Sequence, residues 1–264
     1  MLLPFSSAAR LAALTSSHDF EHARLSYAAE AVNAYMAVKF ASDTSWTSSL
    51  KHDAGADGIS CRVTDLTLTL RTINHAGLID LNVAASTTIA VGLTALGLDE
   101  LQAATLAKSI VAFRSPQRDG ALPIGPEPDF GLKHAPFEDV VELLDFAEMK
   151  QFAPEQLNEI FTVDSHSAFV DRDLASKPLQ SLLTKLGGAV YDGSNPFPAY
   201  TFVTRISRRG EIAIDARIVT VGADRQTGRR SSALPVVATA NAALPSCGAV
   251  LGRDIAAWFE EAFG

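Results

Sequence analysis

The chain has 264 residues, of which 47% are hydrophobic and 20% charged, so it is long enough to bury a core and lacks the composition of a disordered chain. Lys and Arg number 22 against 30 Asp and Glu, and the resulting net charge of −8 opposes binding to a polyanion such as nucleic acid. No run of about 18 apolar residues occurs, so the sequence as given contains no membrane span.

The first predicted element is a long helix over residues 8–42, which contains neither Gly nor Pro. Small and aromatic residues recur along it at spacings of three and four and form one stripe: Phe20, Ala23, Tyr27, Ala31, Ala34, Val38 and Ala41. A stripe of this kind suits close approach of another helix, and it equally suits packing onto a sheet of the same chain. Both interpretations stay open.

Strands are predicted before and after a helical middle. Residues 59–65 and 66–73 alternate apolar and polar side chains, as half-buried antiparallel strands do. The same period returns at 200–206 and 211–221, with a hairpin turn at 208–210. We therefore expect one sheet that carries a helical insertion.

The helical middle contains several predicted helices joined by an irregular loop at residues 115–136, which is rich in Pro and Gly. The helical patterns cover residues 86–113 with a break at Gly97, residues 137–146, a segment from Pro154 and residues 179–186.

An internal repeat opens two of these helical segments. Residues 76–86 align with residues 167–177 at a constant offset of 91, and the shared pattern is apolar, Asp, any residue, Asn or Asp, any residue, Ala. Because a short polar side chain before a helix accepts from its free N–H groups, Asn82 and Asp173 are predicted helix N-caps.

Two cysteines, Cys61 and Cys247, stand in segments predicted to be extended or loop-like, and neither has the spacing of a zinc ligand. In an oxidising compartment they can form a disulfide, and otherwise they are two buried thiols. The sequence leaves both states open.

The order of these motifs resembles the type II secretion system protein K (GspK) family of minor pseudopilins. In the long helix the resemblance rests on residues 27–31. In the two helical modules it rests on residues 77–84, 93–98, 103–113, 137–143, 160–163 and 170–175.

The resemblance implies an α+β fold in which a pilin-like N-terminal helix, residues 1–42, lies on an antiparallel sheet. Residues 43–76 and 189–264 would form the β body. An inserted all-α domain, SAM-like or helix-hairpin-helix-like, would cover 77–188 in two modules, 77–114 and 137–188.

The implied function is that of a minor pseudopilin that caps the tip of the pseudopilus and supports protein export. Its partners would be I-like and J-like minor pseudopilins, bound through Phe20, Ala23, Tyr27, Ala31 and Ala34. The family is anchored in the bacterial inner membrane with its soluble domain in the periplasm. The apolar anchor and the prepilin peptidase site of the family are absent from this sequence.

Two other classes of function fit the sequence less well. Paired helices around a glycine also resemble helix-hairpin-helix nucleic-acid-binding modules, but Asp99 and Glu100 near Gly97 would repel phosphate, so no nucleic-acid partner is expected. No catalytic motif is present, and neighbours such as Ser165 and His166 rarely face each other as a nucleophile and a base must. The sequence therefore predicts a protein that is not an enzyme.

No cofactor is expected. Because some members of the family bind calcium, the acidic loop at residues 119–129 is a possible source of oxygen ligands, although its spacing differs from that of an EF-hand.

Overall fold

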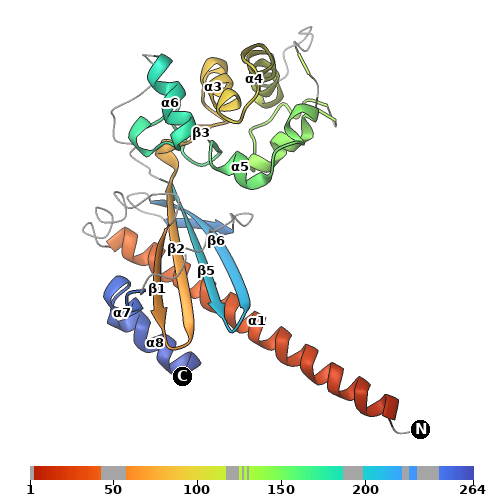
Figure 1. Cartoon of the computed structure of the whole chain (residues 1–264). Helices are drawn as coiled ribbons and strands as arrows, with labels where there is room; N and C mark the ends of the chain where they lie inside the picture. Colours follow the sequence, from red (N-terminus) through yellow and green to blue (C-terminus); the bar gives the residue numbers. More distant parts are fainter. Residues whose placement is uncertain are drawn as a thin grey trace. The chain divides into compact units, whose positions relative to one another are not determined.

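The computed structural model describes residues 3–42, 58–116, 125–126, 128–129, 131–186, 199–221, 226–230 and 244–264 (Figure 1). The chain divides into two compact units. The first comprises Met1–Ile73, Thr201–Ile218 and Gly228–Gly264, and the second comprises Asn74–Tyr200 and Val219–Thr227.

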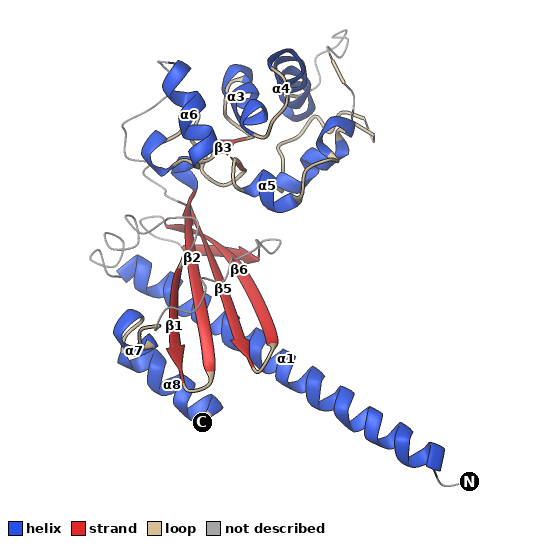
Figure 2. Ribbon diagram, viewed as in Figure 1, coloured by secondary structure: helices blue, strands red, loops and turns tan. Residues whose placement is uncertain are grey.

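The first unit begins with α1 (Leu3–Ser42), a single helix about 60 Å long at 1.5 Å per residue. It starts five residues before the predicted boundary, because Pro4 falls in the first turn, where its missing N–H has no intrahelical partner to lose. One face of α1 is buried against the sheet and is made of Leu25, Ala28, Ala29, Val32, Met36, Ala37 and Phe40. Figure 2 shows the helix lying behind the strands.

A buried amide fixes how α1 lies on the sheet. Asn33 has no exposed surface, and its Nδ2 donates to the main-chain oxygen and to Oδ2 of Asp215 at 2.9 and 2.8 Å. The Asn33 Oδ1 accepts from the hydroxyl of Thr204 at 2.6 Å. Because a buried polar group must be paired, only one register of the helix on the strands satisfies this side chain.

The predicted antiparallel sheet is confirmed, with its strands in the order β1-β2-β5-β6-β7. They are β1 (Ile59–Val63), β2 (Leu66–Asn74), β5 (Ala199–Arg208), β6 (Glu211–Val221) and β7 (Gln226–Arg230). Two residues, Arg209 and Gly210, join β5 to β6 with φ of 49° and 91°. Two left-handed residues match the twist of a tight hairpin, as the turn signal predicted.

The last part of the predicted β body is helical instead. Residues 247–263 form α7 (Cys247–Val250) and α8 (Arg253–Phe263). The buried residues of α8 are Ile255, Ala256, Phe259 and Phe263, whose spacing is that of one helix face and not of a strand.

Cys61 and Cys247 form a disulfide, with their Cα atoms 4.9 Å apart. The bond joins β1 to the first residue of α7 and closes a loop with a sequence separation of 186 residues. Of the two states that the sequence left open, the structure has the disulfide. The prediction that Cys247 stands in an extended or loop-like segment was wrong, because Cys247 begins the short helix α7, which is capped by Ser246.

The second unit is mainly helical. Its α-helices are α3 (Ser86–Ala95), α4 (Glu100–Arg114), α5 (Pro154–Asn158) and α6 (Lys177–Leu186). Short 3-10 helices cover His75–Gly77, Val140–Asp145, Ala147–Met149 and Arg172–Leu174. One continuous apolar core draws on both predicted modules and runs from Ile79 to Leu183.

This unit is not all-α, contrary to the expectation. The strands β3 (Ile79–Asp80) and β4 (Phe161–Thr162) pair in parallel, and each belongs to a different predicted module. Two residues are too few to produce a readable alternation, so the sequence pattern could not reveal them. Residues 140–145 likewise form a 3-10 helix in place of the helix predicted at 137–146.

Within the described residues, none of the helices combines the length and the apolar character that crossing a membrane requires.

Candidate functional site

The outer face of α1 carries the five predicted partner-binding residues. Phe20 and Tyr27 are 68% and 73% exposed, Ala23 is exposed, and Ala31 and Ala34 are half-buried. The face that packs on the sheet lies on the opposite side of the helix. The sheet therefore does not use the predicted stripe, which remains accessible in the first unit, and a role in partner binding remains a prediction.

Within the stripe, three pairs are 11 residues apart, namely Phe20 and Ala31, Ala23 and Ala34, and Tyr27 and Val38, while Phe20, Tyr27, Ala34 and Ala41 follow at intervals of seven. An 11-residue repeat corresponds to about 3.67 residues per turn, close to the 3.6 of a straight helix. The exposed stripe therefore runs almost parallel to the axis of α1, which suits a partner helix that lies alongside it.

Helix α8 borders this stripe and forms a groove with it, about 440 Å³ in volume. The lining comes from α1 on one side and α8 on the other: Phe20, Ala23, Arg24, Tyr27, Ala28, Trp258, Ala262 and Phe263. Trp258 is 38% exposed. Apart from Arg24, the lining side chains are small or aromatic, so the groove is a largely apolar surface open to solvent.

Two arginines hold the end of α8 in place. Arg24 donates to the main-chain oxygen of Ala262, and its guanidinium carbon lies 4.4 Å from the centre of the Phe263 ring. Arg208 donates to the main-chain oxygen of Phe263 at 3.1 Å. These oxygens belong to the last turn of the helix, where positive charge is stabilised.

Arg208 also connects the hairpin turns of the first unit. Its Nε lies 2.8 Å from Oδ1 of Asp65, in the turn between β1 and β2, and its Nη1 lies 3.3 Å from Oε1 of Glu21 on α1. Burial opposes the ionisation of Asp65, but the hydrogen bond and charge of Arg208, with the charge of Arg209, hold the pKa of Asp65 below its ordinary value. Arg208 thus links α1, α8 and the β1–β2 turn.

A buried carboxylate organises the second unit. Asp80 has no exposed surface, and it accepts from the main-chain N–H groups of Asn82 and His166 at 2.8 Å and from the hydroxyl of Ser165 at 3.1 Å. Burial raises the pKa of Asp80, although these hydrogen bonds act in the opposite direction. Ser165 therefore donates to a structural carboxylate, and His166 contributes its main chain to the same group.

The internal repeat is real, but its polar residues act differently from the prediction. Asp80 accepts from the main chain of Asn82, and Asp171 accepts from the main chain of Asp173 at 3.0 Å, so each copy contains the same local turn. The predicted capping role of Asn82 and Asp173 was wrong. The N-cap of α3 is Ala85, and Asp173 lies inside a 3-10 helix.

Asn82 instead pairs with a distant main chain. Its side chain accepts from Phe137 N–H at 2.7 Å and donates to Phe137 oxygen at 3.0 Å. Asn82 takes part in the turn made by Asp80 and does not precede a helix directly. Its side-chain amide therefore bonds to Phe137 and joins the two modules.

The turn between α3 and α4 contains the glycine expected of a helix-hairpin-helix module. Gly97 has φ of 109°, and Asp99 then caps α4 by accepting from the N–H groups of Leu101 and Gln102 at 3.0 and 2.9 Å. A carboxylate thus occupies the helix end at which such modules would hold a phosphate.

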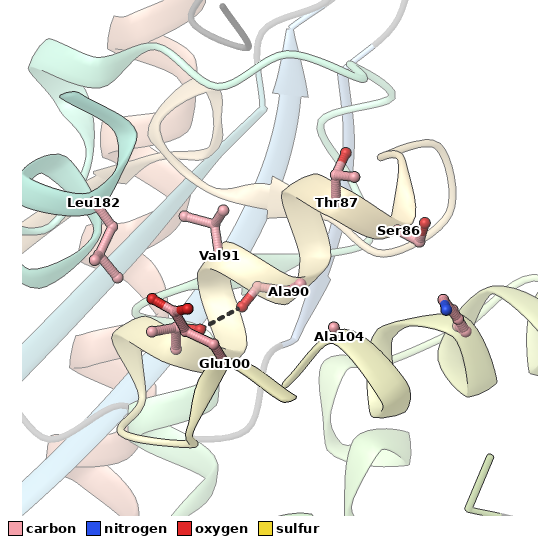
Figure 3. A pocket seen from close by; sticks show the side chains of 9 residues that line it. Ser86, Thr87, Ala90, Val91, Glu100, Ala104 and Leu182 are labelled. Atoms are coloured by element: carbon pink, nitrogen blue, oxygen red, sulfur yellow. Dashed lines mark hydrogen bonds between the residues drawn. The ribbon is translucent and has the colours of Figure 1, made fainter. Parts of the chain in front are cut away.

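A second groove, of about 410 Å³, lies between α3, α4 and Leu182 of α6. Figure 3 shows three of the residues that line it, Ala90 on α3 and Glu100 and Ala104 on α4. The dashed line marks the hydroxyl of Thr94 donating to the Ala90 oxygen at 3.0 Å, a bond within α3. Its lining of mostly small side chains contains no paired nucleophile and base.

The loop considered for calcium lies mostly outside the described residues. Of its acidic side chains Asp129 is described, and it pairs with Lys150. In the described parts of the chain, no three His, Cys, Asp or Glu side chains form a metal-binding group. Calcium binding by this loop remains a prediction.

The arrangement of the first unit, a long helix on an antiparallel sheet whose strands β2 and β5 are separated in sequence by the second unit, is that of a pilin-like protein with an insertion. The chain is similar in structure to a chain in the crystal structure of the GspK-GspI-GspJ complex from the type 2 secretion system of enterotoxigenic Escherichia coli. The TM-score is 0.50 at 14% sequence identity, over 83% of this chain and 99% of that chain.

This match confirms the resemblance to a GspK-like minor pseudopilin at the level of the fold. In sequence, the chain matches no family model and no curated protein. The matched structure is described as part of a type 2 secretion system, and the prediction that this chain is not an enzyme stays a prediction.

Proposed function

We propose that this chain is a minor pseudopilin of a type II secretion system and that it caps the tip of the pseudopilus. The fold shared with a chain of the GspK-GspI-GspJ complex, over nearly all of that chain, carries the proposal. The second unit would be the SAM-like domain that the family resemblance implies.

The two faces of α1 have different surroundings, and this supports a role in assembly. One face of the helix packs on its own sheet, while Phe20, Ala23, Tyr27, Ala31 and Ala34 stay accessible on the other. A contiguous exposed apolar patch usually marks an interaction surface. The stripe on α1 therefore favours a partner that covers it. The partners would be I-like and J-like minor pseudopilins.

The inserted unit would provide the cap. A filament of pilin-like subunits grows only if each subunit can bind the next one. The second unit, inserted in sequence between β2 and β5, adds volume with which an added subunit would collide. The chain would then end the filament and not extend it. It would act at the bacterial inner membrane, with its folded units in the periplasm.

Co-expression with the soluble domains of the I-like and J-like minor pseudopilins tests this proposal. Size-exclusion chromatography with mass determination should detect one complex with a single copy of each protein. Three components that elute separately would overturn the proposal.

The variant Ala31→Arg places a large cation in the middle of the stripe and should abolish the complex while both units stay folded. Ala147→Arg is the matched control, because Ala147 is an exposed alanine of the second unit and receives the same side chain. Unchanged co-elution of Ala31→Arg would reject the stripe as the interface.

A further inference from the structure

The groove between α1 and α8 is more selective than a bare apolar stripe, because α8 adds a second wall. Exposed positions on α8 follow helical spacing and place Asp254, Ala257, Trp258 and Glu261 on one face, with the indole between two carboxylates. Of these four residues, Trp258 lines the groove together with Phe20 and Tyr27 of α1.

Carboxylates also follow the other side of the stripe. Asp19 and Glu30 are 11 residues apart, an interval that also occurs within the stripe, so they share one flank of α1. Asp19 is exposed and Glu30 is half-buried. An apolar strip of aromatic and small side chains therefore runs between two acidic margins, one from α1 and one from α8.

The cations Arg24 and Arg253 do not neutralise Asp19 on α1 or the two carboxylates on α8. Arg24 lies in the groove, but its guanidinium is engaged by the Ala262 oxygen and the Phe263 ring. Arg253 is exposed at the start of α8, five positions before Trp258, and helical spacing turns it to a different side of α8. Negative charge on the open side of the groove therefore comes from Asp19 on one edge and from Asp254 and Glu261 on the other.

From this arrangement we infer that the groove receives one amphipathic helix of a partner protein, whose apolar face packs on Phe20, Tyr27 and Trp258 and whose flanks carry Lys or Arg. The inference rests on the proposed function, because the groove shares Phe20, Ala23 and Tyr27 with the proposed pseudopilin interface. It adds α8 to that interface and defines the charge of the helix that binds.

A second copy of this chain does not fit the same groove. The chain carries a net charge of −8, and a symmetric dimer would place Asp254 and Glu261 of each α8 close to the acidic margins of the other copy. Like charges at an interface oppose association, whereas a helix with basic flanks gains attraction along both margins.

Two synthetic peptides of about 20 residues, long enough to be partly helical, provide the test. Both have the same stripe of Leu and Ala, one with Lys on its flanks and the other with Glu. Each is labelled, and its binding to the full chain is measured by fluorescence anisotropy.

The Lys-flanked peptide should bind at least about tenfold more tightly than the Glu-flanked peptide, because the margins attract one and repel the other. Trp258→Ala should weaken its binding by roughly tenfold or more, as expected for a central aromatic anchor. The double variant Asp254→Asn/Glu261→Gln should retain binding but lose most of the preference for Lys.

Leu101→Ala is the matched control, because it removes a large side chain that is 79% exposed in the second unit and should leave peptide binding unchanged. Equal affinities for the two peptides, no binding of either, or full binding by Trp258→Ala would each overturn the inference. So would a dimer of the chain alone that Trp258→Ala dissociates.

The pseudopilin complex separates this inference from the proposed function. If the complex forms, is lost in Ala31→Arg and is unaffected by Trp258→Ala, the proposed function stands and the role of α8 is rejected. If no complex forms at all, the proposed function fails, and the peptide measurements still decide whether the groove selects a basic helix.

Discussion

Replacing Asn33 with Ala removes the amide that fixes α1 on the sheet. Three hydrogen bonds are lost, two of them to the main chain and carboxylate of Asp215 and one from the Thr204 hydroxyl. A neutral hydrogen bond contributes about 1 kcal/mol and one to a charged group about 1.5–3 kcal/mol, so the free energy of unfolding of the first unit should fall by roughly 3–5 kcal/mol. The Thr204 hydroxyl is also left buried and unpaired in the variant.

Urea unfolding, followed by the fluorescence of Trp258 in α8, measures the free energy of unfolding of the first unit. A Trp46→Phe background leaves Trp258 as the single tryptophan of the chain. Ser26→Ala is the control, because the Ser26 hydroxyl bonds only to the His22 oxygen one turn earlier on α1 and its loss should cost less than about 0.5 kcal/mol.

A double-mutant cycle with Thr204→Val distinguishes the hydrogen bond from general loss of packing. Removing both partners should cost about 1 kcal/mol less than the sum of the two single changes, because neither group is then left unpaired. The reasoning is refuted if Asn33→Ala costs less than about 1 kcal/mol or if the two changes are strictly additive.

Replacing Cys61 and Cys247 with Ala should lower the free energy of unfolding by about 5 kcal/mol, because the disulfide no longer closes a loop with a sequence separation of 186 residues in the unfolded chain. Urea midpoints with and without reductant measure this, and a wild-type midpoint that ignores reductant would contradict it. Burial raises the pKa of Asp80 above 3.8, so the native state holds that proton more tightly than the unfolded state. The stabilisation from this proton is fully present below pH 3.8 and is lost as the pH rises through the raised pKa of Asp80 in the native state. The variant Asp80→Asn should not show this loss. Parallel stability profiles of the two proteins between about pH 4 and 8 would count against this assignment.

The sequence predicted the helices and strands in which the spacing of apolar residues stays regular over the whole element. Alternation over residues 66–73 and 211–221 gave the strands, and a glycine before Glu211 gave the hairpin. The helix at residues 253–263 was missed although its apolar spacing is helical, because the segment was assigned to the sheet through the family resemblance. The strands β3 and β4 exist only through their pairing with each other, and two residues carry no period.

The same distinction separates the predicted and the missed parts of the candidate site. The stripe on α1 depends on spacing within one helix and was visible in the sequence. The groove was not, because Trp258 and Phe263 come beside Phe20 and Tyr27 only when the chain end folds back on α1. Arg208 could not be assigned either, since its partners Asp65 and Glu21 lie 143 and 187 residues away.

The disulfide between β1 and α7 also determines how the chain would transmit tension. A force applied between α1 and α8 would be transmitted from β1 through the disulfide directly into α7. The residues between Cys61 and Cys247 would then bear no tension. The inserted unit would therefore keep its fold under a load that stretches the two ends of the protein. With the sulfurs reduced, the same load would have to pass through β2, β5 and the inserted residues between them, so the covalent link is a mechanical bypass around the insertion.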